Sequence, residues 1–248
     1  MPEISVCIPA YAMGGHGAGF LAESLQVLSR QTHPDFEVVV SDQSEDTAVA
    51  EVCARFAGSL AIRHIWNRDG LRQASANVNF AMDHANGDIL KILFQDDYLN
   101  GDSALQDISD ALAHGSSDWL LCGSGISRNG GPLERPMVPR LGPKLHFGKN
   151  TVSSPSVLAM RRDCTERFDE NLIWLMDVDF YKRLWDAHGD PVILPAPLVV
   201  NRVHDGQVSA GVSKALRQKE LRYILEKFKG NTRLTGHLEY LRQRLKAL

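Results

Sequence analysis

Residues 4–44, ISVCIPAYAMGGHGAGFLAESLQVLSRQTHPDFEVVVSDQS, decide the class of fold. The runs at residues 4–8 and 36–40 are short and rich in β-branched residues, which is typical of buried strands. Between them, apolar residues from 20 to 31 recur at helical spacing. A strand, a helix and a second strand in this order predict two parallel strands joined by a crossover helix.

The same alternation continues along the chain. Residues 60–65 and 89–94 also have the composition of strands, and residues 46–56 and 71–85 have helical periodicity. We therefore expect an α/β fold with a Rossmann-like, mostly parallel central sheet flanked by helices. Ligands of such sheets bind beyond the carboxyl ends of the strands, so the residues that follow each strand are candidates for a site.

Composition excludes several classes of protein. The chain has 248 residues, of which 44% are hydrophobic and 23% charged, as in an ordinary soluble globular protein. Its net charge of −3 gives no reason to expect nucleic acid as a partner. The four cysteines form no CxxC pair, which favours a reducing compartment over a disulfide framework or a zinc site. Without a secretory leader pattern or an apolar stretch long enough to span a bilayer, we expect a cytoplasmic protein.

Residues 213–248 form a basic tail on an acidic body. From Lys214 onward there are ten Lys and Arg residues against three Glu, whereas the preceding residues hold 17 basic and 27 acidic side chains. Leucines at helical spacing on both sides of Gly230 and Asn231 predict two helices. Two interpretations are open. The helices pack on the rest of the chain or on a second subunit of a homodimer, or they contact an anionic membrane surface.

Acidic residues follow several of the expected strands. Asp96 and Asp97 end the apolar run 89–94, and adjacent carboxylates tolerate one another best with a hard cation such as Mg²⁺ or Mn²⁺ between them and a phosphate. The alternative is that Asp97 caps a turn or helix. Asp42 has two interpretations as well: an Asx turn with Ser44, or an acceptor for the imide N–H of a pyrimidine base. The glycines at 14–19 do not have the spacing of a dinucleotide fingerprint.

Later segments add an acid and a histidine. Asp177 lies among hydrophobic residues near an expected helix start, where it serves either as a cap or as a partly desolvated general base with a raised pKa. His204 follows the strand-like run 192–200 and becomes a ligand candidate only in the company of other polar groups. Residues 123–150 are rich in Gly and Pro and predict a long surface loop.

Together, these segments resemble the family-2 glycosyltransferases of GT-A type, over residues 4–209. The resemblance rests on an ordered series of segments: the opening strand 5–11, the second strand 36–44 with its aspartate, Asn79, the segment 85–89, the DXD-type motif at Gln95, Asp96 and Asp97, the segment from Phe168 to Asp179, and Arg202-Val203-His204. It implies a GT-A domain over residues 1–212, with a nucleotide-binding half at about 1–100 and an acceptor-binding half at about 101–212, followed by the helical tail 213–248.

The resemblance also implies an activity. We expect an inverting transfer of a sugar from a nucleoside diphosphate donor, UDP- or dTDP-linked, to a hydroxyl acceptor such as a glycan or lipid-linked glycan, in bacterial cell-surface polysaccharide or glycoconjugate synthesis. A lipid-linked acceptor would place the protein at the inner face of the membrane. Asp177 is the expected base, and Asp97 and His204 the expected ligands of Mg²⁺ or Mn²⁺. The expected donor-binding residues are Pro9, Ala10, Tyr11, Asp42, Arg72, Asn79 and Asp96.

The sequence departs from the family pattern at four positions. Ala12 and Val78 stand where Asn and Arg are usual, Phe94 replaces a first aspartate, and Met176 replaces the usual Glu before Asp177. Arg72 is the expected substitute for the missing positive charge. Two other functions therefore stay open: a sugar nucleotidyltransferase, or a nucleotide-sugar-binding protein that has lost catalysis.

Overall fold

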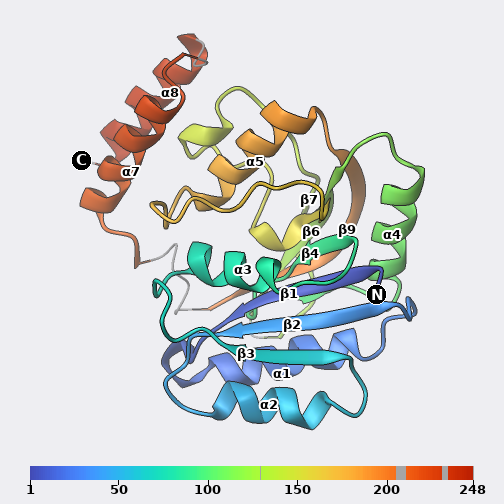
Figure 1. The fold of residues 1–248 in the computed structure, drawn as a ribbon. Helices are drawn as coiled ribbons and strands as arrows, with labels where there is room; N and C mark the ends of the chain where they lie inside the picture. Colours follow the sequence, from blue (N-terminus) through green and yellow to red (C-terminus); the bar gives the residue numbers. More distant parts are fainter. Residues whose placement is uncertain (129, 205–210, 231–233, 248) are drawn as a thin grey trace.

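The computed structural model describes residues 1–248 except 129, 205–210, 231–233 and 248. Its first half is a parallel sheet in the order β3-β2-β1-β4. The strands are β1 (Ile4–Ala10), β2 (Phe36–Asp42), β3 (Ile62–Trp66) and β4 (Ile89–Ile92). Helices α1 (Gly17–Leu28) and α2 (Ala48–Phe56) cover one face, and α3 (Ala74–Asp83) covers the other (Figure 1). The expected Rossmann-like half is confirmed.

The second half of the sheet is mixed rather than parallel. Strand β8 (Leu158–Arg161) lies antiparallel between β4 and β6 (Trp119–Arg128), while β9 (Val192–Val203) runs parallel to β6. The short strands β5 (Tyr98–Leu99) and β7 (Glu134–Met137) pair antiparallel with β9 and β6. β8 follows an irregular segment instead of a crossover helix, so nothing constrains it to the parallel direction.

The expected loop at 123–150 is only partly a loop. Its first six residues extend β6, and residues 134–137 form β7. Gly123 and Gly125 are not turn residues but places of close approach: a Cβ on Gly123 would lie 2.5 Å from the Pro195 carbonyl oxygen, and one on Gly125 would lie 2.6 Å from the Leu133 side chain. A glycine inside a strand marks such an approach as often as it marks a break.

The described residues form four more α-helices: α4 (Ala104–His114), α5 (Met176–His188), α7 (Lys214–Lys227) and α8 (Leu234–Lys246). Short 3-10 turns lie at Met13–Gly15, Leu145–Phe147 and Pro155–Val157. In the described ranges, no helix is long and apolar enough to cross a membrane. The two tail helices lie side by side beyond α3 and α5 (Figure 1).

The tail helices differ in how they meet the rest of the chain. On α7, Leu221 and Ile224 are completely buried and belong to the hydrophobic core. On α8, Leu238, Leu241 and Leu245 are 53–70% exposed. Helix α7 is therefore part of the folded body, whereas α8 keeps an apolar stripe on the surface.

Candidate active site

A cleft of about 630 Å³ opens beyond the carboxyl ends of β1 and β4 and reaches the beginning of α5. Parallel strands present their carboxyl ends at one edge, which is why segments far apart in sequence meet here. Of the residues expected from the sequence, the cleft is lined by Pro9, Tyr11, Arg72, Asp96 and Asp177. The other lining residues are Met13, Gln43, Gln73, Ala74, Asn77, Phe94, Gln95, Asn150, Ser154, Pro155, Ile173, Trp174, Met176 and Val212.

Asp96 and His204 form a pair at the cleft. Asp96 follows β4 and His204 follows β9, and their Oδ2 and Nε2 atoms lie 3.0 Å apart. Both side chains are mostly buried, and the ring of Phe20 packs on that of His204 with centroids 4.8 Å apart. A carboxylate oxygen and an imidazole nitrogen that meet in this way are a donor set that fits a divalent cation such as Mn²⁺.

Asp97 points away from the cleft into the protein. Its Oδ2 accepts hydrogen bonds from the hydroxyls of Ser156 and Ser154 at 2.6 and 3.0 Å, and Oδ1 accepts one from the Arg202 N–H at 3.3 Å. Burial, followed by the charge of Asp96, raises the pKa of Asp97 to about 7. Three protein donors already satisfy this carboxyl, so its position fits a support beneath Asp96 better than a ligand in the cleft.

Tyr11 and Gln95 connect the ends of β1 and β4. The Tyr11 N–H donates to Gln95 Oε1 at 2.7 Å, and Gln95 Nε2 donates back to the Tyr11 carbonyl at 3.0 Å. Gly17, at the start of α1, fits against this link, since a Cβ there would lie 2.0 Å from the Tyr11 carbonyl oxygen. Burial, and then Asp96, raise the pKa of the Tyr11 phenol. The reciprocal pair fixes the rim of the cleft beside Asp96.

The remaining expected donor-side residues are placed differently from one another. Arg72 lies at the cleft rim, where its guanidinium contacts Glu45 at 2.7 Å. Ala10 is fully buried, and its carbonyl accepts a hydrogen bond from Asn77 Nδ2 at 3.0 Å. Asp42 is also fully buried: its Oδ1 accepts from the Ser44 N–H at 2.8 Å. That bond is the Asx turn considered from the sequence, and the contact of Asp42 with a base stays a prediction.

The side chains of Asp42 and Asn79 both make hydrogen bonds within the protein. His64 Nε2 lies 2.8 Å from Asp42 Oδ2 and occupies the second carboxylate oxygen. Asn79 lies on α3, where its amide donates to the Phe168 carbonyl at 2.9 Å and accepts from the Phe168 N–H at 2.8 Å. Asn79 therefore ties α3 to the segment that leads to α5, whereas Asn77, two residues before it, lines the cleft.

Asp177 also lines the cleft, in the first turn of α5. Its Oδ2 accepts from Asn150 Nδ2 at 2.7 Å and its Oδ1 from the Val178 N–H at 2.7 Å. Burial is the largest influence and raises the pKa of Asp177 to about 7, although these hydrogen bonds act in the opposite direction. A carboxyl with this pKa is suited to accept a proton near neutral pH.

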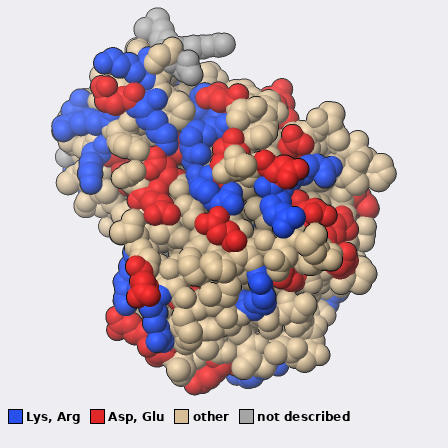
Figure 2. Space-filling model, in the orientation of Figure 1, with Lys and Arg blue, Asp and Glu red and all other residues tan. Residues whose placement is uncertain are grey.

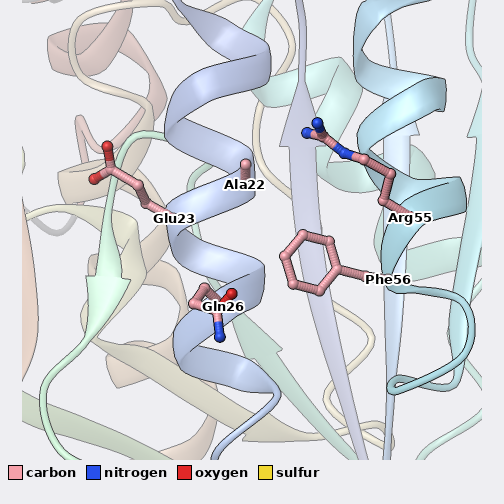
Figure 3. Close-up of a pocket in the computed structure, with 5 residues that line it drawn as sticks. All are labelled: Ala22, Glu23, Gln26, Arg55 and Phe56. Carbon is pink, nitrogen blue, oxygen red and sulfur yellow. The ribbon is translucent and has the colours of Figure 1, made fainter.

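Two other features lie away from the cleft. Cys164, Glu166 and His188 approach one another, and His188 Nε2 is 2.9 Å from Glu166 Oε2, which accounts for the group as a histidine–carboxylate pair. A hollow between α1 and α2 is lined by Ala22, Glu23, Gln26, Arg55 and Phe56 (Figure 3). There, Phe56 extends toward α1 while Glu23 points away, and the Glu23 carboxylate is taken by Arg202 at 2.7 Å. Its polar groups do not converge on a ligand position.

Sequence reasoning missed several side chains of the site. In the sequence, Gln95 stands out only as part of a motif, yet its side chain fixes Tyr11. Asn150 lies in the expected loop and reaches Asp177. Glu220, in the tail, accepts the N–H groups of Ile173, Trp174 and Leu175 just before Asp177, and no local pattern connects it with a residue 43 positions earlier. The one signal available for Glu220 was that it is acidic in a strongly basic segment.

The comparisons with known proteins concern the family and the fold. The model of the family described as glycosyl transferase family 2 matches residues 5–181. None of the curated proteins compared with the chain matches it. Among solved structures, S. aureus TarS 1–349 in complex with UDP-GlcNAc is 21% identical with a TM-score of 0.73, over 99% of this chain and 72% of that one.

Two further structures extend this. Another crystal structure of S. aureus TarS is 21% identical, with a TM-score of 0.70. The alignment covers 99% of this chain but only 43% of that chain. A mannosyltransferase from Pyrobaculum calidifontis, PcManGT in complex with GDP-Man and Mn²⁺, is 18% identical with a TM-score of 0.67, over 99% of this chain and 74% of that one. The predicted GT-A fold is thus confirmed, and the chain belongs to glycosyl transferase family 2.

Proposed function

We propose that this chain transfers a sugar from a nucleoside diphosphate sugar to a hydroxyl group with inversion at the anomeric carbon. The observation that carries the proposal is that Asp96, paired with His204, and Asp177 line the same cleft. A leaving diphosphate and an attacking alcohol lie on opposite faces of the sugar in an inverting reaction. Asp96 with His204 offers a group for the first, and Asp177 offers one for the second.

The donor side is assigned to Asp96 and His204. We assign the cation to this pair in place of Asp97, because Asp97 does not line the cleft and its carboxylate is occupied by protein donors. Asp96 and His204 would hold Mg²⁺ or Mn²⁺, which would supply the positive charge that stabilises a departing diphosphate, so that no general acid is needed. Pro9 and Tyr11 lie beside it for the base and ribose, and Arg72 at the rim offers a further positive charge to the phosphates.

The acceptor side is assigned to Asp177. Its carboxylate removes the proton of the acceptor hydroxyl as that oxygen attacks the sugar. Asn150 donates to one carboxylate oxygen and the Val178 N–H to the other, which holds the carboxylate in place. One carboxylate, that of Asp177, suffices as the general base. The Glu that usually precedes it in the family, here Met176, is not required for the proton transfer. Ile173 and Trp174 form an apolar surface next to it on which an acceptor can rest.

The donor and the acceptor are proposed by class. UDP-GlcNAc and GDP-Man are bound by two of the similar structures, which supports a nucleotide-linked hexose, and we keep UDP or dTDP as the carrier. The acceptor is a glycan or lipid-linked glycan of bacterial cell-surface synthesis. The exposed leucines of α8, with Arg242 and Lys246 on the same helix, offer a peripheral contact with an anionic membrane where a lipid-linked acceptor would be. Figure 2 shows basic side chains gathered over the tail helices.

Product analysis tests the proposal. The purified chain is incubated with a panel of nucleotide sugars, Mn²⁺ or Mg²⁺, and glycan acceptors. Release of nucleoside diphosphate together with a glycosylated acceptor supports glycosyl transfer. Release of pyrophosphate would instead identify a nucleotidyltransferase, and tight donor binding without any product would identify an inactive binding protein.

Sedimentation with vesicles tests the membrane contact. Binding to anionic vesicles at low salt that is lost in Leu241→Glu supports it. Dimerisation of the chain in solution, lost in the same variant, would mean that the stripe on α8 pairs with a second copy instead.

A further inference from the structure

Helix α7 contacts the segment that leads into the proposed base. Glu220 is buried, with only 1% of its surface exposed, although it lies in a basic and largely exposed tail. Its Oε1 accepts the Ile173 N–H at 2.8 Å, and its Oε2 accepts those of Trp174 and Leu175 at 3.0 and 2.8 Å. One carboxylate therefore receives three consecutive backbone N–H groups immediately before α5.

Leu175 is the N-cap residue of α5, and its side chain cannot accept a hydrogen bond, so the start of the helix lacks the usual Ser, Thr or Asp cap. A carboxylate near a helix N-terminus is also favoured by the helix dipole. Glu220 accepts the N–H of this N-cap residue and those of the two residues before it, so it fixes the turn that leads into α5 rather than the first N–H groups of the helix itself. It does so from a helix more than forty positions downstream, and Asp177 follows two residues after Leu175.

Further contacts join α7 to the same region. Arg217 lies over the Trp174 ring at 5.1 Å, and Tyr223 donates to Asp169 Oδ2 at 2.8 Å. Lys227 contacts Asp179 at 2.8 Å, two residues after Asp177. The segment between Asp169 and Asp179 is thus held along its length by α7, and this segment contributes Ile173 and Trp174 as well as Asp177 to the cleft.

We propose that Glu220 is a positioning residue, which fixes the backbone at residues 173–175 and thereby sets the place and the electrostatic environment of the Asp177 carboxylate. The inference rests on the proposed role of Asp177 as the base. It makes helix α7 a support of the catalytic residue, although Glu220 does not line the cleft.

The electrostatic part follows from the groups around Asp177. In the described part of the chain these are Asn150 from the loop before β8, Tyr181 one turn along α5, and Glu220 from α7. Glu220 is a like charge and raises the pKa of Asp177, in addition to the larger effect of burial. Removing its charge therefore lowers that pKa, and the acid limb of the kcat profile moves to lower pH.

The test compares Glu220→Gln with Glu226→Gln. Glu226 lies on the same helix but is exposed, with Lys229 at 3.6 Å as its ion-pair partner, so it is a matched control. For Glu220→Gln we expect kcat to fall by about 10- to 100-fold, as for a displacement of roughly 1 Å at a reacting group. The donor KM and the affinity for UDP with Mn²⁺ stay unchanged, and the acid limb moves to lower pH. Glu226→Gln behaves as the wild type.

Several results overturn the inference. One such result is a Glu220→Gln enzyme with unchanged kcat and pH profile. Another is an equal loss of nucleotide affinity and kcat, which indicates a general structural role. If Glu220→Gln does not fold, Glu220→Asp takes its place: it keeps the charge but is one methylene shorter, so kcat falls while the acid limb and the UDP affinity stay in place. A Glu220→Asp enzyme with wild-type kcat refutes the positioning role. A wild-type chain that transfers no sugar overturns the proposed function itself, and this inference with it.

Discussion

Replacing Asp177 with Asn separates activity from stability. In the folded protein burial raises the pKa of Asp177 from 3.8 to about 7. Between these two pH values, the carboxyl is protonated to a greater extent in the folded state than in the unfolded state. The free energy of unfolding therefore falls as the pH rises from about 4 to about 7. Above about pH 7, the folded protein carries the full cost of the buried charge.

The size of this cost follows from the pKa difference. At 1.36 kcal/mol per pH unit, it reaches about 4 kcal/mol as an upper limit. The side chain is only partly buried, so we expect water to reduce it to about 2 kcal/mol. For a chain of this size, that is a rise in Tm of about 4–8 °C for Asp177→Asn near pH 8, and almost none near pH 4. Because the base is lost, kcat falls by about 10²- to 10⁴-fold.

The assay is thermal unfolding at both pH values together with kcat at pH 8. Asp179→Asn is the control, because Asp179 is fully buried, and its loss removes the carboxylate that pairs with Arg183 and one of the two that pair with Lys227. That variant should lower Tm at pH 8. If Asp177→Asn does not raise Tm at pH 8, the Asp177 carboxylate does not lie in a poorly solvated site. Near-normal kcat would remove Asp177 from the role of base.

Three further variants test other parts of the site. Asp96→Asn should weaken Mn²⁺-dependent binding of UDP by at least about tenfold in a calorimetric titration; an affinity unaffected by EDTA in the wild type contradicts the cation site. Asn79→Ala should lower the free energy of unfolding by about 1–3 kcal/mol in urea while leaving UDP affinity intact, because its hydrogen bonds are structural. Gly17→Ala should displace Tyr11 and weaken donor binding, whereas Gly19→Ala, where a Cβ meets nothing within 4 Å, should not; equal affinities would disprove the role of the Tyr11 link.

The parallel half of the fold and the general place of the site could be predicted from the sequence. Strand and helix periods alternate clearly up to residue 94, and the rule that ligands lie at carboxyl ends then points to Tyr11 and Asp96. The antiparallel strand β8 could not be predicted in this way. It is four residues long and owes its place to pairing with β4 and β6, which no local pattern records.

The division of work between Asp96 and Asp97 was also beyond the sequence. Asp96 and Asp97 follow β4 in a turn, where the alternation of side chains along a strand does not apply, so the sequence does not say which of them faces the cleft. Which one does so depends on the partners: Ser154, Ser156 and Arg202 receive Asp97, and His204 receives Asp96. All four come from segments far along the chain.

The pairing of Asp96 with His204 across 108 positions has a consequence for biosynthesis. During synthesis the first four strands emerge from the ribosome early and can associate, but β9 and His204 emerge only after about four-fifths of the chain. A nascent polypeptide therefore holds Asp96 without its histidine until β9 has been translated, and the proposed ion site is completed only then. Premature termination before β9 would leave the first four strands without this pair.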